Sequence, residues 1–411
     1  MPHTKSLVVI GGGSAGFFCG VNAARMNPLL KVIILEKGNK LMSKVKISGG
    51  GRCNVTHACF DIAAMSRNYP RGSNFVKKTF HRFFTTDTIK WFEDRSVKLK
   101  TETDGRMFPV TNTSQTVIDC LLQEANTYGV EIRMKSEVKN LKSEGRKFRI
   151  ELSNHNHFTS DIVCISSGGY PKSDLFGWLK ELGHTIEEPV PSLFTFNLPK
   201  HPITKLMGVS IEKAKVKIAG TKLEQKGPLL ITHWGLSGPA VLKLSAFAAK
   251  ELAIRQYDFT AVINWLPDIN EQSLKERFNN LRNAYSSQKI HNRNPFGLPS
   301  RLWVFLAQHS GATTDMRWAD LPSVAQDKFI KNLCSYDIEV RGKTTFKEEF
   351  VTAGGIKLSE VDANTMMSKK ISNLFFAGEV LDVDGITGGY NFQHAWTSGW
   401  IAASSIAGEA L

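Results

Sequence analysis

Three glycines near the N-terminus have the spacing of a turn that binds a pyrophosphate. The run Gly11-Gly12-Gly13-Ser14-Ala15-Gly16 fits the pattern G-x-G-x-x-G and directly follows the apolar residues 7–10. In this pattern the first glycine permits a tight turn, the second lets the backbone approach the phosphates, and the third allows a helix to pack closely on a strand. The N-terminus of the following helix directs its dipole at the phosphates. We therefore expect a pyrophosphate at Gly11, Gly13, Ser14, Ala15 and Gly16.

An acidic residue follows this turn at the distance expected of a ribose ligand. Glu36 lies 20 residues after Gly16, at the end of the strand-like run 31–35. A carboxylate at this place accepts hydrogen bonds from ribose hydroxyls and disfavours a 2′-phosphate. The turn, the acid and the further residues Lys37 and Val138 are therefore predicted to bind a dinucleotide. The alternative is a glycine-rich turn with a structural role alone.

A second glycine cluster lies one loop beyond Glu36, in the run Lys46-Ile47-Ser48-Gly49-Gly50-Gly51-Arg52-Cys53-Asn54. Successive glycines expose amide N–H groups that can hold phosphate or cofactor edges, and an arginine adds a fixed positive charge. We expect cofactor contacts from Ser48, Gly49, Gly50, Arg52, Cys53 and Asn54. The alternative is an ordinary loop with a structural arginine. Cys53 has no partner base in the local sequence, so it is not predicted to be a nucleophile.

The C-terminal part of the chain favours FAD over NAD as the dinucleotide. Residues 373–379 read as an apolar strand that ends in Gly378 and Glu379, and a glycine turn then leads into a helix over 394–403. An acid at the strand end can bind ribityl hydroxyls, and a helix N-terminus aimed at the isoalloxazine can stabilise negative charge on a reduced flavin. The predicted contacts are Gly378, Glu379, Gly388, Gly389, Tyr390, Asn391 and Phe392.

Three residues are candidates for catalysis, each with a plainer alternative. His233 lies in the run 232–239 just before an expected helix, where it is either a substrate-facing acid or base or a histidine of a structural turn. Tyr390 either shields or protonates the substrate or packs on the cofactor. Arg106, in the turn 105–109, either holds an anionic substrate or lies in water.

Motifs along nearly the whole chain are similar to those of one bacterial flavoprotein family, the NAD(P)/FAD-dependent oxidoreductases of aminoacetone-oxidase type with an insert domain, which includes bile-acid dehydro-reductases. The resemblance implies cofactor contacts at the glycines of these motifs, Glu36, Arg52 and Glu379, and at Ser167, Gly168 and Gly169. The family's Ala-Thr-Gly-Gly is Ser166-Ser167-Gly168-Gly169 here, a small-residue exchange that should keep the approach to the cofactor. The motifs, in family order, are GGGSAG, KISGGGRCN, GRMFP, SSGG, THWGLSGP, TAGG and AGEVLDVDGITGGYNFQHAW.

The expected fold class is α/β, because the N-terminal strands alternate with a helix over 14–26. The resemblance implies a glutathione-reductase-like Rossmann FAD-binding domain that is interrupted by an insert. We predict the first part of the FAD domain at 1–188, an insert that is β-rich and then helical at 189–346, and the second part of the FAD domain at 347–411. Prolines at 189, 191, 199 and 202 are interpreted as a linker between the first two parts.

Composition narrows the functional classes. The six cysteines form no C-x-x-C pair and no metal-ligand spacing, so we expect free thiols in a reducing cytosol and no metal. No run approaches the roughly 20 apolar residues needed to span a bilayer, and the N-terminus is interpreted as a first strand, not a signal peptide. The net charge of +14 favours anionic partners, although no block of like charges occurs and a diffusely basic surface is the alternative.

The leading hypothesis is an FAD-dependent oxidoreductase that acts on a small organic substrate. NAD(P)H is a candidate reductant, although neither residues 150–190 nor the insert contain a second strand, glycine turn and helix for it. A second hypothesis is a flavoprotein that modifies or binds RNA, which the net charge favours and the lack of an RNA-binding motif disfavours. A third is a flavin-binding sensor without turnover. The sequence leaves the substrate and the oligomeric state open.

Overall fold

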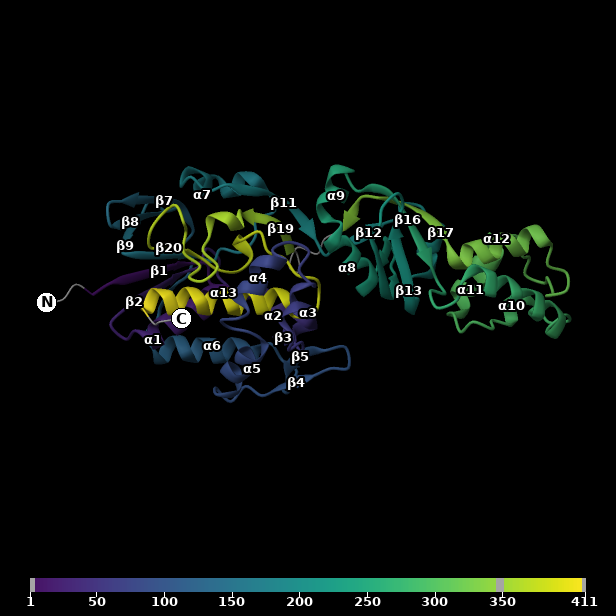
Figure 1. The fold of residues 1–411 in the computed structure, drawn as a ribbon, viewed down its shortest axis with the longest axis horizontal. Coiled ribbons are helices and arrows are strands. Elements are labelled where there is room, and N and C mark those ends of the chain that lie inside the picture. Colours follow the sequence, from purple (N-terminus) through teal and green to yellow (C-terminus); the bar gives the residue numbers. More distant parts are fainter. Residues whose placement is uncertain (1–3, 345–350, 409–411) are drawn as a thin grey trace. The chain divides into compact units, whose positions relative to one another are not determined.

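The computed structural model describes residues 4–344 and 351–408. Their contacts group them into two compact units: unit 1 contains residues up to Ser192 together with those from Val351 onward, and unit 2 runs from Leu193 to Thr344. Figure 1 shows the elements of both units in the order of the chain. No helix of the described residues is long and apolar enough to cross a membrane.

Unit 1 is built on a five-stranded parallel sheet with the strand order β20-β10-β1-β2-β6. Its central strand β1 pairs with both neighbours in parallel register, so that Ile10 is opposite Leu35 of β2 and Ile165 of β10. The strands are buried on both faces, as parallel strands covered by helices are. This sheet confirms the predicted α/β fold of Rossmann type. Its strands are β1 (Ser6–Ile10), β2 (Lys31–Leu35), β6 (Glu131–Arg133), β10 (Ile162–Ile165) and β20 (Leu374–Phe376).

Helices α1 (Ser14–Met26) and α13 (Tyr390–Ala407) pack against each other beside this sheet, although they come from opposite ends of the chain (Figure 1). Glycine permits the close approach, because a Cβ on Gly399 would lie 2.7 Å from the carbonyl oxygen of Ala15. The remaining helices of unit 1 are α2 (Ser43–Gly51), α3 (Ile62–Ser66), α4 (Ser73–Thr79), α5 (Thr85–Glu93), α6 (Gln115–Thr127) and α7 (Gly177–Glu181).

Three smaller antiparallel sheets complete unit 1. They are β7 (Val138–Glu144) with β8 (Lys147–Leu152) and β9 (His157–Ser160); β3 (Thr56–His57) with β5 (Arg106–Pro109) and β4 (Leu99–Thr101); and β11 (Ile186–Ser192) with β19 (Val351–Ile356). Pro189 and Pro191, which were interpreted as linker residues, lie inside β11. A register shift between Glu187 and Val190 accommodates the missing N–H of Pro189.

Unit 2 contains a seven-stranded antiparallel sheet with the order β17-β16-β13-β14-β15-β12-β18. Its helices include α10, α11 and α12, and the large apolar side chains of Trp265, Trp303 and Trp318 are fully buried in its core. The strands are β12 (Thr195–Asn197), β13 (Ser210–Ile218), β14 (Glu224–Ile231), β15 (Gly235–Ser237), β16 (Asp258–Asn264), β17 (Tyr336–Arg341) and β18 (Lys343–Thr344). The helices are α8 (Pro239–Phe247), α9 (Ala249–Ile254), α10 (Glu271–Ala284), α11 (Ser300–His309) and α12 (Ser323–Cys334).

Candidate functional site

The glycine turn after β1 leaves a helix N-terminus open to a ligand. A Cβ on Gly16 would lie 2.0 Å from the carbonyl oxygen of Gly11, so this glycine is required where α1 packs on the turn. No heavy atom lies within 4 Å of the place where a Cβ of Gly13 would stand. Helix α1 begins just after Gly13 with no side-chain cap and no acid in its first turn. The positive end of the helix dipole at Gly13 therefore fits a pyrophosphate.

Glu36 ties this turn to the next loop and retains capacity for a ligand. One carboxylate oxygen, Oε2, accepts a hydrogen bond from the Gly12 N–H at 2.9 Å, and Oε1 accepts one from the Gly38 N–H at 2.7 Å. Each carboxylate oxygen has two lone pairs, so both can still accept a ribose hydroxyl. The carboxylate is thus held in place where the dinucleotide fingerprint puts the ribose.

A pocket beside Glu36 brings several predicted residues together. Tyr170 and Trp178, which the sequence did not single out, contribute aromatic rings, and the Lys37 ammonium lies 5.7 Å from the Tyr170 ring centre. Apolar walls next to a hydrogen-bonding carboxylate suit a nucleoside. The lining residues are Ile10, Gly11, Leu35, Glu36, Lys37, Ser136, Glu137, Val138, Ser167, Tyr170 and Trp178.

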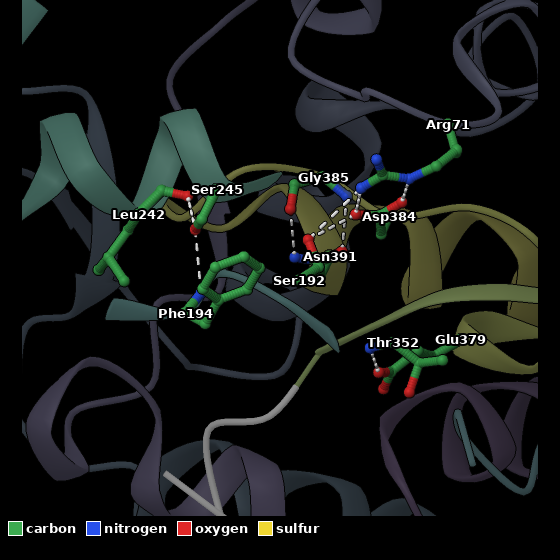
Figure 2. Close-up of polar contacts among 10 residues, drawn as sticks. All are labelled: Arg71, Ser192, Phe194, Leu242, Ser245, Thr352, Glu379, Asp384, Gly385 and Asn391. Atoms are coloured by element: carbon green, nitrogen blue, oxygen red, sulfur yellow. Dashed lines mark hydrogen bonds and ion pairs between the residues drawn. The ribbon is translucent and has the colours of Figure 1, made fainter. Parts of the chain in front are cut away.

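Glu379 forms a second polar centre against the first turn of α1. It lies in the short 3-10 helix η5 (Gly378–Val380), and a Cβ on Gly378 would lie 2.7 Å from the Cβ of Ala15. One Glu379 oxygen accepts a hydrogen bond from the Thr352 N–H at 2.9 Å (Figure 2), and the other forms an ion pair with Lys44. The sequence did not single out Lys44, and Thr352 entered only as part of a family motif.

The wall of this second centre carries a buried hydroxyl that is open to a ligand. The Thr352 Oγ1 is buried without a hydrogen-bond partner among the described residues. A Cβ on Gly169 would lie 2.5 Å from this oxygen and 3.0 Å from Glu379 Oε1, so glycine keeps the space between them free. The glycine, the hydroxyl and the carboxylate fit the hydroxyl-rich ribityl chain of FAD, as Glu36 fits its ribose.

The cluster over residues 48–54 forms a loop in which Gly49, Gly50, Gly51 and Cys53 have positive φ angles. A Cβ on Gly50 would meet no heavy atom within 4 Å, so this backbone is open to a ligand. Burial raises the pKa of Cys53 to about 12, so its side chain remains a thiol, in agreement with the expectation that it is no nucleophile. With its amide oxygen turned toward Gly389, Asn54 accepts a hydrogen bond from the Gly389 N–H at 2.9 Å.

Both predicted arginines are engaged by acids of unit 1. The Arg52 guanidinium forms an ion pair with Glu102 at 2.5 Å, and its centre lies 4.0 Å from the ring centre of Phe108. Arg106 forms ion pairs with Asp104 at 2.7 Å and with Glu102 at 3.1 Å. These contacts give Arg52 a structural role, and a contact to the cofactor or substrate stays a prediction for both arginines.

The turn over Gly388 and Gly389 places Tyr390 at the start of α13. The Tyr390 ring stacks on His57, with ring centres 4.8 Å apart, and its carbonyl accepts a hydrogen bond from the Tyr69 hydroxyl at 2.6 Å. His57 Nδ1 in turn donates to the Gly388 carbonyl at 3.0 Å. Burial raises the pKa of Tyr390 above its usual value, so the phenol stays protonated.

Two further residues of this turn have structural contacts. The Asn391 side-chain amide accepts from the Gly385 N–H at 2.8 Å and donates to the Gly385 carbonyl at 2.9 Å (Figure 2). Phe392 stacks on Trp396 of the same helix, with ring centres 5.8 Å apart. Both residues therefore stabilise the turn, and a cofactor contact from either stays a prediction.

His233 is the one predicted site residue that lies in unit 2. It is exposed between β14 and β15, where its ring meets the edge of Trp234 at 4.4 Å between ring centres. All other predicted residues belong to unit 1, where Gly11 to Gly16, Glu36 and Glu379 surround the N-terminus of α1. The arrangement can bind an extended dinucleotide by its ribose, pyrophosphate and ribityl groups.

Comparison with known proteins identifies the family. The model described as HI0933-like protein Rossmann domain matches residues 5–405. Ribosomal RNA dihydrouridine synthase of Escherichia coli K12 is 31% identical to this chain over 408 residues and 97% of both chains. The 3-dehydro-bile acid delta(4,6)-reductase of Clostridium scindens is 26% identical over 407 residues, which are 97% of this chain and 98% of the reductase.

Solved structures share the fold. The 3-ketosteroid-delta4-(5alpha)-dehydrogenase of Rhodococcus jostii RHA1 has a TM-score of 0.51 and 12% sequence identity, with 98% of this chain and 97% of that chain covered. The 3-ketosteroid delta1-dehydrogenase of Sterolibacterium denitrificans also has a TM-score of 0.51 and 12% identity, with 98% of this chain and 100% of that chain covered. The chain belongs to the HI0933-like family of Rossmann-fold, FAD-dependent oxidoreductases, as its motifs predicted.

Proposed function

We propose that this protein is an FAD-dependent reductase that adds a hydride and a proton across a carbon–carbon double bond conjugated to a carbonyl group. We further propose that its substrate is a uracil base in ribosomal RNA. Two relatives from different substrate classes support the reaction type. Dihydrouridine, named for the relative from Escherichia coli, is uridine whose C5–C6 double bond, conjugated to the C4 carbonyl, has been saturated. The 3-dehydro and delta(4,6) terms of the other name denote a carbonyl conjugated to double bonds.

The residues of unit 1 would hold FAD along its length. Glu36 would accept hydrogen bonds from the adenosine ribose, the open N-terminus of α1 at Gly13 would bind the pyrophosphate, and Glu379 would accept from the ribityl hydroxyls. Once reduced, the bound flavin supplies the hydride. The protein contributes orientation and a fixed electrostatic environment, which the buried strands beneath these residues keep rigid.

The state of Tyr390 limits what this residue can do in the reaction. Burial raises its pKa, because the phenolate would lose its hydration. The side chain therefore stays a hydrogen-bond donor throughout the neutral pH range and releases its proton only at a large cost. We assign it the orientation of a carbonyl or flavin oxygen by hydrogen bonding, and not the delivery of the proton to carbon.

The distribution of charge is the observation that carries the choice of RNA over a small molecule. Between residues 193 and 344 there are 21 Lys and Arg against 12 Asp and Glu, a net charge of +9 out of +14 for the chain. The excess lies in unit 2, whereas the predicted cofactor residues lie in unit 1. A positive surface outside the cofactor unit supports a polyanionic substrate. The higher identity to the RNA-modifying relative, 31% against 26%, supports the same choice.

The reductant is proposed to be NADH or NADPH. In residues 4–344 and 351–408, the parallel sheet of unit 1 is the only one, and its glycine turn is assigned to FAD. A nicotinamide donor would therefore bind without a Rossmann unit of its own, as a substrate that enters and leaves.

The test follows the flavin spectrum without oxygen. The purified protein, loaded with FAD, is bleached with NADH and NADPH in parallel, and unmodified large-subunit ribosomal RNA made by transcription is then added. We expect reoxidation of the flavin and a uridine that gains the mass of two hydrogen atoms. Reoxidation by a 3-oxo-delta(4,6) steroid but not by RNA would move the substrate to the small-molecule class. Reoxidation by neither would refute the proposed reaction.

A further inference from the structure

The helical part of unit 2 contains the longest run of the chain without an acidic residue. Residues 277–314 include no Asp or Glu, and they contain Arg277, Arg282, Lys289, Arg293 and Arg301. The run comprises the end of α10, the connection to α11, and α11 itself. A long polar segment of one charge sign is typical of a surface that meets a polyanion.

The fold brings a second basic segment beside this connection. Lys289 and Arg317 form an isolated antiparallel bridge, and the Ile290 N–H donates to the Met316 carbonyl at 3.0 Å. Arg282 donates from Nη2 to the Ala319 carbonyl at 3.2 Å. The side chains of Lys289, Arg293 and Arg317 are exposed, and Arg282 is half-buried. We call these four residues, Arg282, Lys289, Arg293 and Arg317, the basic tip.

The guanidinium groups of the basic tip are available to a ligand, and one is already ordered. The Arg293 guanidinium lies 4.4 Å from the ring centre of Tyr285, and its Nη2 donates to the Tyr285 hydroxyl at 2.8 Å. In the described part of the chain, none of the three guanidinium groups forms an ion pair. The acids nearby are Asp315, which pairs with Lys289 at 2.5 Å, and Asp320.

Other lysines of unit 2 differ in this respect. On the sheet, Lys213 and Lys226 share the carboxylate of Asp268, and Lys215 pairs with Glu224 at 3.5 Å. These lysines are already neutralised by carboxylates of the protein. They serve as a matched set of charges in the same unit that should not bind phosphate.

We infer that the basic tip binds the phosphate backbone of the RNA, an inference that rests on the proposed RNA substrate. Arginine forks match phosphate oxygens bidentately, and each neutralised phosphate releases counterions. The large hydrophobic side chains that are exposed include Met207, Ile254 and Val324, but none between residues 277 and 319. The lack of apolar anchors there argues against a membrane surface as the partner.

The experiment compares two variants of the full-length, FAD-loaded protein with equal loss of charge. Arg293→Gln with Arg317→Gln removes two groups of the basic tip, and Lys213→Gln with Lys226→Gln removes two paired lysines. Binding to a transcribed fragment of large-subunit ribosomal RNA is measured over a range of salt concentrations. The basic-tip variant should lose roughly 0.7–0.9 per phosphate contact from the slope of log K against log salt, and bind about ten-fold or more weakly at low salt. The lysine variant should match the wild type.

The outcomes separate this inference from the proposed reaction. Equal weakening in both variants, or none in either, would overturn the basic tip. Tighter binding to anionic phospholipid vesicles than to RNA would also overturn it. Formation of dihydrouridine by the wild type is scored independently, so RNA binding through the basic tip without any reduction would leave the surface standing and refute the reaction. Unchanged FAD content and thermal unfolding show that the variants are folded, and each single Arg→Gln variant, with half the change in slope, replaces the pair if it is not.

Discussion

The Arg71 guanidinium binds both oxygens of the Asp384 carboxylate, which is completely buried (Figure 2). Ser192, the last residue of β11, donates a third hydrogen bond to this carboxylate at 2.8 Å. The Ile386 N–H donates to the Asn68 carbonyl at 3.0 Å, close to the same place. The segment before α13 is therefore held from two sides, and with it the turn that carries Tyr390.

Removal of one partner from this buried pair should destabilise the protein strongly. Asp384→Asn leaves the Arg71 charge largely buried without a counter-charge, which costs about 3–5 kcal/mol in comparable pairs. Ser192→Ala removes a single hydrogen bond to a charged group, and we expect a loss of about 1–3 kcal/mol. Urea unfolding measures both, with the exposed Lys90→Gln as the control. A loss for Asp384→Asn that is no larger than for the control would contradict the assigned role.

Two glycines of the same motif should respond to alanine in opposite ways. Gly16→Ala places a Cβ 2.0 Å from a backbone oxygen, so the fold should lose stability or fail to form. Gly13→Ala places its Cβ in open space, and the φ of −91° is accessible to alanine. We therefore expect Gly13→Ala to unfold like the wild type in a thermal melt and to retain less FAD after gel filtration. Normal FAD retention by Gly13→Ala would move the pyrophosphate away from this turn.

Glu36 and Glu379 should act on opposite ends of FAD. Glu36→Ala removes hydrogen bonds to ribose hydroxyls, each worth about 1.5–3 kcal/mol, so the FAD affinity should fall roughly ten-fold or more with an unchanged flavin spectrum and redox potential. Glu379→Ala should change the spectrum or potential as well as the affinity. The measurements are FAD titration, absorption spectra and a redox titration. Equal losses of affinity with unchanged spectra, or no loss in either variant, would contradict the placement.

His394 should make stability depend on pH in the acidic range. It is buried in α13, neither ring nitrogen has a partner among the described residues, and burial lowers its pKa to about 4. As the pH falls from about 6.5 toward 4, the unfolded chain binds a proton that the folded chain does not, so roughly 3 kcal/mol of stability is lost. Urea unfolding at several pH values should show a smaller decline in His394→Gln than in the wild type. Parallel curves would mean that His394 is charged, or its proton shared, in the folded protein.

The parts of the site that the sequence predicts depend on local spacing. The glycine turn and Glu36 lie within one β-α-β unit, where chain geometry fixes their relation, and the structure joins them through the Gly12 N–H. The partners of Glu379 could not be predicted in this way. Lys44 is separated from Glu379 by 335 positions, and no local pattern links the two residues.

Two interpretations differ from the structure for physical reasons. Prolines at 189 and 191 indicated a linker, but a bulge lets both occupy a strand that pairs with β19. Arg52 was predicted to bring positive charge to the cofactor, yet Glu102, about fifty positions later in the chain, pairs with it. A sequence pattern identifies a charged group, whereas the neutralising partner is set by tertiary packing.

The pairing of β11 with β19 has a consequence for how the chain can change. Ser192, the last residue of unit 1 before unit 2, is the register partner of Val351, the first described residue after it. Topologically, unit 2 is therefore an enlarged hairpin loop that begins and ends on neighbouring strands. Such a segment can be exchanged as a cassette, or shortened to a tight turn, without altering the order or register of the parallel sheet. Descendants of one redox scaffold can in this way acquire new substrates while they inherit the dinucleotide site intact.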